Sequence, residues 1–192
     1  DQDDKVKSLG TLMDVYYKSV GRNSLLLLNV PPNNEGLLPA PDVARLREFR
    51  AALEAIFSLD FALGKPCTAS NSRGGDRAYH PGNATDTSAG SYWATDDSVT
   101  EASLEVDLGS PKTFNVARLE EMISLGQRVE KYRLEARVDG EWKKITEGTT
   151  IGRKKLDRFE TVAADKVRLV IEKSLACPTI RSLGLHLDSG RR

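Results

Sequence analysis

A run of four leucines between two amphipathic segments constrains the fold of this chain more than any other feature. Residues 24–30 read Ser-Leu-Leu-Leu-Leu-Asn-Val, and Pro31 and Pro32 follow at once. An apolar run of this length that is closed by prolines predicts a strand buried on both faces, the kind found in parallel sheets. Such a strand needs neighbours on both edges to pair its backbone donors and acceptors. Residues 1–57 contain no second run of this kind, so we expect those neighbours to be missing from this segment.

Both segments that flank the leucine run have the spacing of an amphipathic helix. Apolar side chains recur every three or four residues from Val6 to Val20, which predicts a helix over about residues 4–20. A second helix is expected to begin at Pro41-Asp42. Its apolar face consists of Val43, Leu46, Phe49, Leu53 and Ile56. Two helices and one strand cannot enclose this face, so we expect it to meet a β domain of this chain or a second copy of the chain.

The order helix, buried strand, helix is typical of α/β folds with a parallel sheet. We therefore predict that residues 1–59 are the end of a larger (β/α) barrel, an α-β-α remnant of its last turn. The sequence begins at Asp1 with no basic and apolar leader segment after it, and we expect it to be a fragment of a longer translation product.

After residue 60 the pattern changes to short β runs separated by turn residues. Residues 131–138 alternate strictly between charged and apolar side chains, with Tyr132 and Leu134 on the apolar face. Asp139-Gly140 follows, which is a strong hairpin signal. Further runs cover residues 103–108, 114–120, 166–171 and 183–187. Many short strands without long helices between them predict an antiparallel β-sandwich over residues 60–192, so the chain as a whole is expected to be mostly β.

Composition excludes two classes of partner. The 28 basic and 28 acidic side chains give a formal net charge of zero, so electrostatic attraction to nucleic acid or to anionic lipid is not expected. The leucine run is far shorter than the ~20 apolar residues that cross a bilayer, so we expect no membrane anchor. Two cysteines, Cys67 and Cys177, are too few for a disulfide scaffold. Both fall near the terminal strands of the predicted sandwich, which leaves a single disulfide open.

Two sets of short motifs resemble one known family. Residues 14–37, from Asp14-Val-Tyr-Tyr through Leu-Leu-Leu-Leu-Asn-Val-Pro-Pro to Glu-Gly-Leu37, resemble the end of the catalytic barrel of α-L-fucosidases, closest to the branch that acts on α-1,3/1,4 linkages. The second half resembles their appended discoidin-like module, a fold shared with coagulation-factor C domains and galactose-binding modules. Its motifs are at residues 64–66, 68–71, 92–97, 104–109, 125–129, 148–152 and 176–178.

The resemblance implies a retaining glycoside hydrolase, which needs a carboxylate nucleophile and a second carboxyl group as acid and base. In this family both are expected on earlier barrel strands, before Asp1. We therefore assign no catalytic residue and expect the chain alone to be inactive. Asn29 ends the last barrel strand, and active sites of such barrels lie at the carboxyl ends of the strands, so Asn29 is a candidate for the active-site rim. The alternative is that its amide caps the following loop.

The discoidin-like resemblance also implies a binding site in the sandwich loops. It requires no cofactor but allows a calcium ion, for which Asp86 and Ser91 are the candidate ligands. The family pattern departs at Thr87, where a Gly is usual, and at Ser182, where an acid is usual, so we expect weak calcium binding. Candidate sugar contacts are Tyr79, His80 and Tyr92. Trp93 and Trp142 sit in strand contexts and are predicted to be core residues.

The favoured function is thus the C-terminal portion of an α-L-fucosidase that removes α-linked fucose from glycans. In this hypothesis the chain supplies barrel closure and an accessory carbohydrate-binding-like domain, and its partner is the missing catalytic barrel or a second copy of the chain. The alternative is a stand-alone lectin-like module that binds fucosylated or galactose-containing glycans without catalysis. A third reading is a sandwich that only supports the barrel. The resemblance implies secretion, to an extracellular or periplasmic location.

Overall fold

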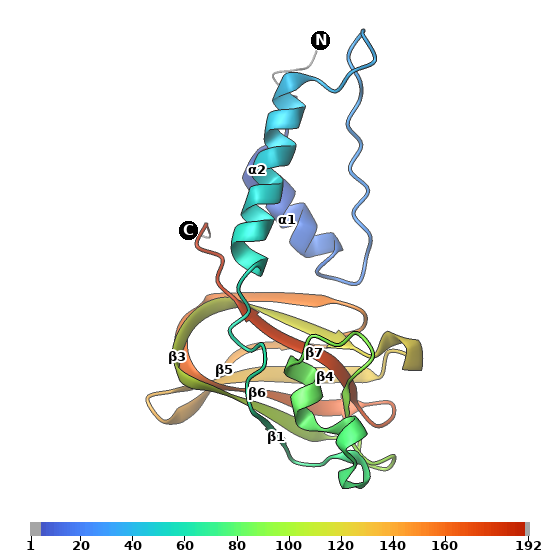
Figure 1. Cartoon of the computed structure of the whole chain (residues 1–192), viewed down its shortest axis with the longest axis vertical. Coiled ribbons are helices and arrows are strands. Elements are labelled where there is room, and N and C mark those ends of the chain that lie inside the picture. Colours follow the sequence, from blue (N-terminus) through green and yellow to red (C-terminus); the bar gives the residue numbers. More distant parts are fainter. Residues whose placement is uncertain (1–4, 191–192) are drawn as a thin grey trace.

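Two helices stand on a β-sandwich in the computed structural model, which describes residues 5–190 (Figure 1). Helix α1 spans Leu9–Ser19 and helix α2 spans Ala40–Phe57. Both predicted helices are confirmed, but α1 begins later than expected because Ser8 caps it, with its Oγ accepting a hydrogen bond from Thr11 N at 3.2 Å. Residue 4, where the sequence pattern placed the start of α1, lies outside the described residues. No helix in residues 5–190 has the length and apolar character needed to span a membrane.

The predicted buried strand at residues 24–30 is wrong for this structure. The segment runs beside the helices as an extended stretch with no assigned strand (Figure 1). Its side chains nevertheless alternate as in a strand, because Leu26, Leu28 and Val30 are half-buried while Leu25 and Leu27 are 84% and 89% exposed. The physical reason is that a strand needs neighbours to pair its backbone groups. Within the part of the chain that the structure describes, no strand lies beside this segment.

The predicted antiparallel β-sandwich is confirmed. The strands are β1 (Cys67–Ala69), β2 (Trp93–Ala94), β3 (Ala102–Glu121), β4 (Val129–Val138), β5 (Glu141–Gly148), β6 (Lys155–Ser174) and β7 (Thr179–His186). Within residues 5–190 they form one seven-stranded sheet in the order β2-β7-β3-β6-β4-β5, and β1 pairs with β3. The sequence predicted two separate strands at residues 103–108 and 114–120. In the structure both belong to the single long strand β3.

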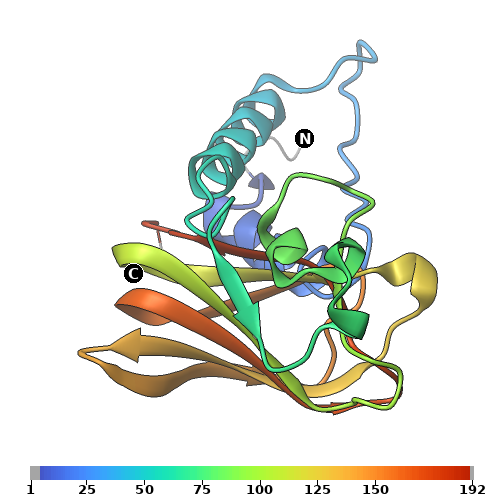
Figure 2. The same ribbon diagram turned by 60° about the horizontal axis from the view of Figure 1, so that its bottom comes forward.

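The sheet becomes a sandwich because its two longest strands bend together. The first part of β3 pairs with β1 and with the end of β6, whereas its second part pairs with β7 and with the beginning of β6. Between these parts the register of β3 against β6 shifts, from Asp107 to Lys112. Such irregularities bend a strand. The sheet therefore folds over on itself into two layers (Figure 2).

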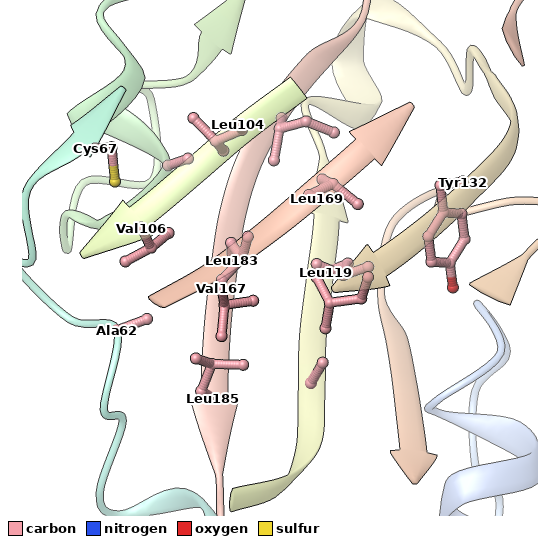
Figure 3. Packing of buried hydrophobic residues seen from close by; sticks show 14 of the residues in the cluster. Ala62, Cys67, Leu104, Val106, Leu119, Tyr132, Val167, Leu169, Leu183 and Leu185 are labelled. Atoms are coloured by element: carbon pink, nitrogen blue, oxygen red, sulfur yellow. The ribbon is translucent and has the colours of Figure 1, made fainter. Parts of the chain in front are cut away.

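The core lies between the two layers and is almost wholly aliphatic and aromatic (Figure 3). Its largest fully buried side chains are Trp93, Leu104, Leu108, Phe114, Leu119, Tyr132, Leu134, Ile151, Leu169, Ile171, Ile180 and Leu183. The alternation predicted for β4 is confirmed, since Tyr132, Leu134 and Ala136 are fully buried. Asp139 and Gly140 have φ of 53° and 84°, as the predicted tight hairpin requires. This turn sets the register that keeps the charged residues of β4 on the outer face.

Helix α1 is tied to the sandwich through one buried tyrosine. Tyr17 Oη donates a hydrogen bond to Asp188 Oδ2 at 3.2 Å, and the guanidinium of Arg158 lies 4.2 Å from the centre of its ring. Val116 and Leu156 complete a small apolar cluster around it. Burial, followed by the nearby Asp188 carboxylate, raises the pKa of Tyr17, so its hydroxyl stays a neutral donor. The contact therefore joins α1 to β3, to β6 and to the residues just after β7.

A second tie follows α1, where the chain turns toward the extended segment. Asn23 has a positive φ of 68°, its Nδ2 donates to Ile151 O at 3.0 Å, and its Oδ1 accepts from Lys154 N at 2.8 Å. Gly152 lies between these two contacts, and its own N–H donates to Glu121 Oε2 at 2.6 Å. The loop before β6 is thus held from both sides.

The end of α2 is tied to β7. His186 Nδ1 lies 2.8 Å from Leu59 O, which can only accept, so this nitrogen carries the proton. The ring of Phe57 packs edge-on against the His186 ring at 5.1 Å. Asp60 Oδ1 accepts from the backbone N–H groups of Ala62 and Leu185, at 3.0 and 2.9 Å. The helices are therefore joined to the sandwich at their carboxyl-terminal ends.

The apolar face of α2 is only partly enclosed. Phe49 and Ile56 are buried, and the ring of Tyr16 in α1 lies 6.1 Å from that of Phe49. Val43, Leu46 and Leu53 are half-buried. Helix α1 of the same chain therefore covers part of this face, and Val43, Leu46 and Leu53 stay only half-buried, as expected if two helices and one extended segment cannot enclose it.

Replacing Gly152 by alanine tests the tie at Asn23. A Cβ there would lie 2.7 Å from Asn23 Oδ1 and 2.8 Å from Gln127 Oε1, so it would push Asn23 away from Lys154 N and also displace the end of Gln127. Gly140→Ala is the matched control, because Gly140 also has a positive φ but no atom within 4 Å of the added Cβ. We expect Gly140→Ala to cost about 1 kcal/mol in urea unfolding and Gly152→Ala about 1 to 3 kcal/mol more. Equal losses would show that the contact of Asn23 does not stabilise the fold.

Candidate functional site

A hollow of about 620 Å³ opens at the end of the helical segment that is remote from the sandwich. Three stretches border it: the residues just before α1, the beginning of α2, and the end of the extended segment with its loop. The lining residues are Lys5, Val6, Lys7, Leu12, Leu28, Asn29, Val30, Pro31, Pro32, Asn33, Asn34, Glu35, Pro39, Asp42, Arg45 and Leu46. Polar and charged groups make up about half of this lining.

The direction of the chain explains why these stretches meet. Helix α1 runs toward the sandwich, the extended segment returns, and α2 runs toward the sandwich again (Figure 1). The amino ends of both helices therefore lie beside the carboxyl end of the extended segment. In α/β barrels this is the face where the loops after the strands build the active site.

The loop beyond the extended segment is closed by Asn33. Its Oδ1 accepts hydrogen bonds from Glu35 N at 2.9 Å and Leu37 N at 3.0 Å, and its own N–H donates to Leu37 O at 2.8 Å. Closing the loop therefore does not need Asn29, the residue to which the sequence analysis gave this role as an alternative. Asn29 is exposed at the border of the hollow. Its place at an active-site rim stays a prediction.

The carboxyl groups that line the hollow belong to Glu35 and Asp42. Glu35 lies exposed in the loop, and Asp42 lies in the first turn of α2, where a negative charge complements the helix dipole. The helix dipole thus accounts for Asp42, and the absence of a catalytic residue from this chain stays a prediction.

A second candidate site lies in the loops of the sandwich. Tyr79, in the 3-10 turn Arg77–Tyr79, and Tyr92, just before β2, have ring centroids 5.6 Å apart. The guanidinium of Arg73 lies 5.3 Å from the centre of the Tyr79 ring. His80 does not join them in a polar contact, because its Nδ1 accepts from Gly82 N at 3.0 Å within its own turn. Two of the three predicted sugar contacts are thus together, with an arginine that the sequence analysis missed.

The two cysteines do not form the disulfide that the sequence left open. Both thiols are free and buried, and each has its own partners. Cys67 Sγ lies 3.4 Å from Thr85 Oγ1, whereas Cys177 Sγ accepts from Arg73 Nη2 at 3.0 Å and from Arg128 Nη1 at 2.9 Å. Whether the two cysteines lie close enough to form a disulfide could not be predicted from the sequence, because it depends on how the intervening loops fold. Cys177 instead joins the loop of Arg73 to the loop of Arg128.

The predicted calcium ligands are neighbours but make a poor calcium site. Ser91 Oγ lies 2.8 and 2.7 Å from the two oxygens of Asp86, and Ser88 N donates to Asp86 Oδ1 at 2.8 Å. Calcium takes six to eight oxygen ligands. No group of three or more His, Cys, Asp or Glu side chains suited to a metal occurs in residues 5–190. Asp86 and Ser91 alone supply fewer oxygens than calcium takes, and calcium binding stays a prediction.

The two tryptophans differ in their surroundings. Trp93 is fully buried, and its Nε1 donates to Asn71 O at 3.0 Å, so its prediction as a core residue is confirmed. Trp142 is half-buried on the outer face of β5, where the guanidinium of Arg168 lies 4.3 Å from its ring centre. The prediction of a core role is wrong for Trp142, because strand alternation points it away from the core.

Comparisons with known proteins agree with this architecture. The model of the F5/8 type C domain family matches residues 66–182. A putative α-L-fucosidase 1 of rice, Oryza sativa subsp. japonica, is 44% identical over 188 residues, which are 97% of this chain and 36% of the rice protein. A crystal structure of a putative α-L-fucosidase from Bacteroides thetaiotaomicron has a TM-score of 0.90 at 35% identity, covering 95% of this chain and 40% of that chain.

A further similar structure is that of a Ruminococcus gnavus GH29 fucosidase in complex with fucose, with a TM-score of 0.88 at 36% identity, covering 94% of this chain and 37% of that chain. The chain thus spans little more than a third of the length of these relatives. The similarity extends beyond the sandwich to the helices and the leucine segment. The chain belongs to the F5/8 type C domain family through residues 66–182 and, over nearly its whole length, corresponds to the C-terminal part of α-L-fucosidases.

Proposed function

We propose that this chain closes and supports the catalytic barrel of an α-L-fucosidase, an enzyme that removes α-linked fucose from glycans. The observation that carries the proposal is the extended leucine segment, which has the side-chain alternation of a strand but no strand beside it. We propose that residues 1–59 form the end of the barrel and residues 60–192 form an accessory sandwich. The remainder of the fucosidase polypeptide is then the partner that covers the segment.

Two exposed leucines support the proposal that another part of the polypeptide covers this segment. Leu25 and Leu27 are 84% and 89% exposed, and burying a leucine side chain is worth about 1.5–3 kcal/mol. Neighbouring barrel strands would bury both side chains and would pair the backbone groups of the segment. Secretion, as expected for an enzyme that acts on glycans outside the cell, is part of the same proposal.

The sandwich supports the barrel end through the contacts of Tyr17, Asn23 and His186. These lie at the carboxyl-terminal ends of both helices and before the extended segment begins. They hold the directions of α1, the segment and α2 relative to one another. In this proposal the sandwich stabilises a barrel whose last turn would otherwise have only a small apolar cluster of its own.

The isolated 192-residue chain should release no aryl alcohol from an aryl α-L-fucoside. The reason is that the paired carboxyl groups needed for glycoside hydrolysis are expected in the remainder of the polypeptide. A sensitive chromogenic assay at high protein concentration checks this, with the longer fucosidase polypeptide as the positive control. Fucoside hydrolysis that copurifies with the isolated chain would refute the proposal that the catalytic carboxyl groups lie in the remainder of the polypeptide.

Leu27→Lys tests whether a partner covers the leucine segment. In the isolated chain this change should shift the free energy of unfolding by no more than about 0.5 kcal/mol, because the side chain is exposed. In the longer polypeptide it should lower soluble yield or fucosidase activity at least about 10-fold, because a charge would be buried between strands. Leu175→Lys, at a leucine that is 71% exposed in the sandwich, is the control and should be tolerated in both. Tolerance of Leu27→Lys in the longer polypeptide would contradict barrel closure.

A lectin-like role is the second candidate function, and the Tyr79 and Tyr92 pair favours it. Two tyrosine rings with an arginine beside them offer an apolar face and hydrogen-bond donors to a sugar. Burial raises the pKa of Tyr92, so its hydroxyl is a neutral donor and acceptor at neutral pH. Fucosylated or galactose-containing glycans are the ligands that this role would imply.

Titration of fucose and galactose into the whole chain, followed by NMR with and without calcium, separates support from glycan binding. We expect millimolar affinity or none, and little effect of calcium, because Thr87 and Ser182 stand where the calcium loop of the family usually has a Gly and an acid. Saturable shifts at micromolar sugar around Tyr79 and Tyr92 would favour the lectin-like role instead. An Asp86→Ala variant serves as the control for any calcium effect.

A further inference from the structure

The extended segment has two distinct sides. Leu26, Leu28 and Val30 are half-buried, and Leu28 and Val30 share the lining of the hollow with Leu12 of α1 and Leu46 of α2. The intervening side chains, Leu25, Leu27 and Asn29, are exposed. Successive side chains of an extended chain point to opposite sides, so these three share the side that faces away from the packed helices.

In an α/β barrel the helices form the outer ring, and the side of each strand that faces away from them lines the barrel interior. If the chain closes such a barrel, Leu25 and Leu27 lie in the packed interior and Asn29 follows them toward the carboxyl end. Asn29 lies at the end of the segment, beside the hollow that Leu28 and Val30 line on the helix-facing side. In a closed barrel it is therefore the polar side chain of the inward-facing side, at the end where substrates bind.

The structure also removes the simplest structural role for Asn29. The loop after the segment is closed by the side chain of Asn33, which accepts two backbone hydrogen bonds. The carboxamide of Asn29 offers one acceptor and two donors on an exposed side of the chain. Among apolar neighbours in a closed barrel, such a group would be costly without a hydrogen-bond partner.

We propose that Asn29 binds the fucosyl unit of the substrate by hydrogen-bonding one of its ring hydroxyl groups. This proposal rests on the proposed function, since the barrel interior exists only if the rest of a fucosidase surrounds the segment. Asn29 then acts in substrate binding and orientation. It takes no part in proton transfer, because a carboxamide does not titrate at neutral pH.

The test compares Asn29→Ala with the parent enzyme in the longer fucosidase polypeptide. The substrates are an aryl α-L-fucoside and a set of analogues that each lack one ring hydroxyl. We expect kcat/KM on the complete substrate to fall about 10- to 100-fold, as for a hydrogen bond lost in a closed site. On the analogue that lacks the partner hydroxyl, the variant and the parent should have nearly equal kcat/KM, because the contact is already absent.

Asn33→Ala is the matched comparison. It opens the loop that Asn33 closes, so any loss of activity should be similar on every analogue. A loss in Asn29→Ala that is likewise uniform across the analogues, or no loss at all, overturns the assignment of Asn29 while leaving barrel closure intact. If Asn29→Ala is unstable, Asn29→Leu, which is similar in size and has no hydrogen-bonding group, is assayed in its place, with the same dependence on one hydroxyl expected. A parent polypeptide without fucosidase activity would refute the proposed function and this inference together. Tolerance of Leu27→Lys in the longer polypeptide would do the same, because it would contradict barrel closure.

Discussion

The buried carboxylate of Glu121 organises the part of the sandwich on which the helical segment rests. Glu121 is 1% exposed, and its two oxygens accept hydrogen bonds from the backbone N–H groups of Arg128, Val129 and Gly152, at 2.8, 3.0 and 2.6 Å. A buried carboxylate is tolerable only when such donors surround it. One side chain thus fixes the loop after β3 and the loop before β6. Asn23 then binds the second of these loops on both sides of Gly152, so the turn into the leucine segment is set by the sandwich.

This dependence explains why the helical segment can keep its shape with so little core of its own. Its apolar cluster with the sandwich contains the buried residues Tyr17, Val116 and Leu156, and only the first of these comes from a helix. The rings of Tyr16 and Phe49 pack the two helices against each other, and directed contacts at the helix ends attach the helices to the sandwich. Polar contacts of this kind depend on geometry and lose their value if either side moves. The sandwich therefore holds the helical segment mainly through polar contacts at fixed positions.

Local patterns in the sequence predicted much of the fold. The three- and four-residue spacing located both helices, the alternation in residues 131–138 located the buried side chains of β4, and Asp139-Gly140 located the hairpin. The leucine run was misjudged as a formed strand because strand formation depends on partners, which a local pattern cannot supply. Whether the two cysteines form a disulfide could not be predicted either. Contacts across long sequence separations, such as that of Cys177 with Arg73, leave no periodic signal.

The same limit applies to the candidate sites: local sequence patterns predicted some of their residues, but not the contacts between distant parts of the chain. Tyr79 and Tyr92 were predicted as aromatic sugar contacts, and the structure brings them together, but Arg73 was not predicted because nothing in its local sequence marks a contact with Tyr79. Asn29 was found because its position at the end of a strand-like run has a meaning in barrels. The side of the segment on which it lies follows from the exposed fractions of its neighbours, which only the structure supplies.

The distance between the two candidate sites bears on what the sandwich does. The hollow lies at the amino end of α2, whereas the sandwich is tied to its carboxyl end. A helix of 18 residues is about 27 Å long, so α2 separates the hollow from the junction by several sugar lengths. The tyrosine pair, which lies in the sandwich beyond that junction, cannot share a monosaccharide with Asn29. Under the proposed function, glycan contact there would engage a distant part of a large substrate, whereas the contacts at Tyr17, Asn23 and His186 would hold the barrel end whatever the substrate. This separation supports the proposal that the sandwich acts mainly by holding the barrel end.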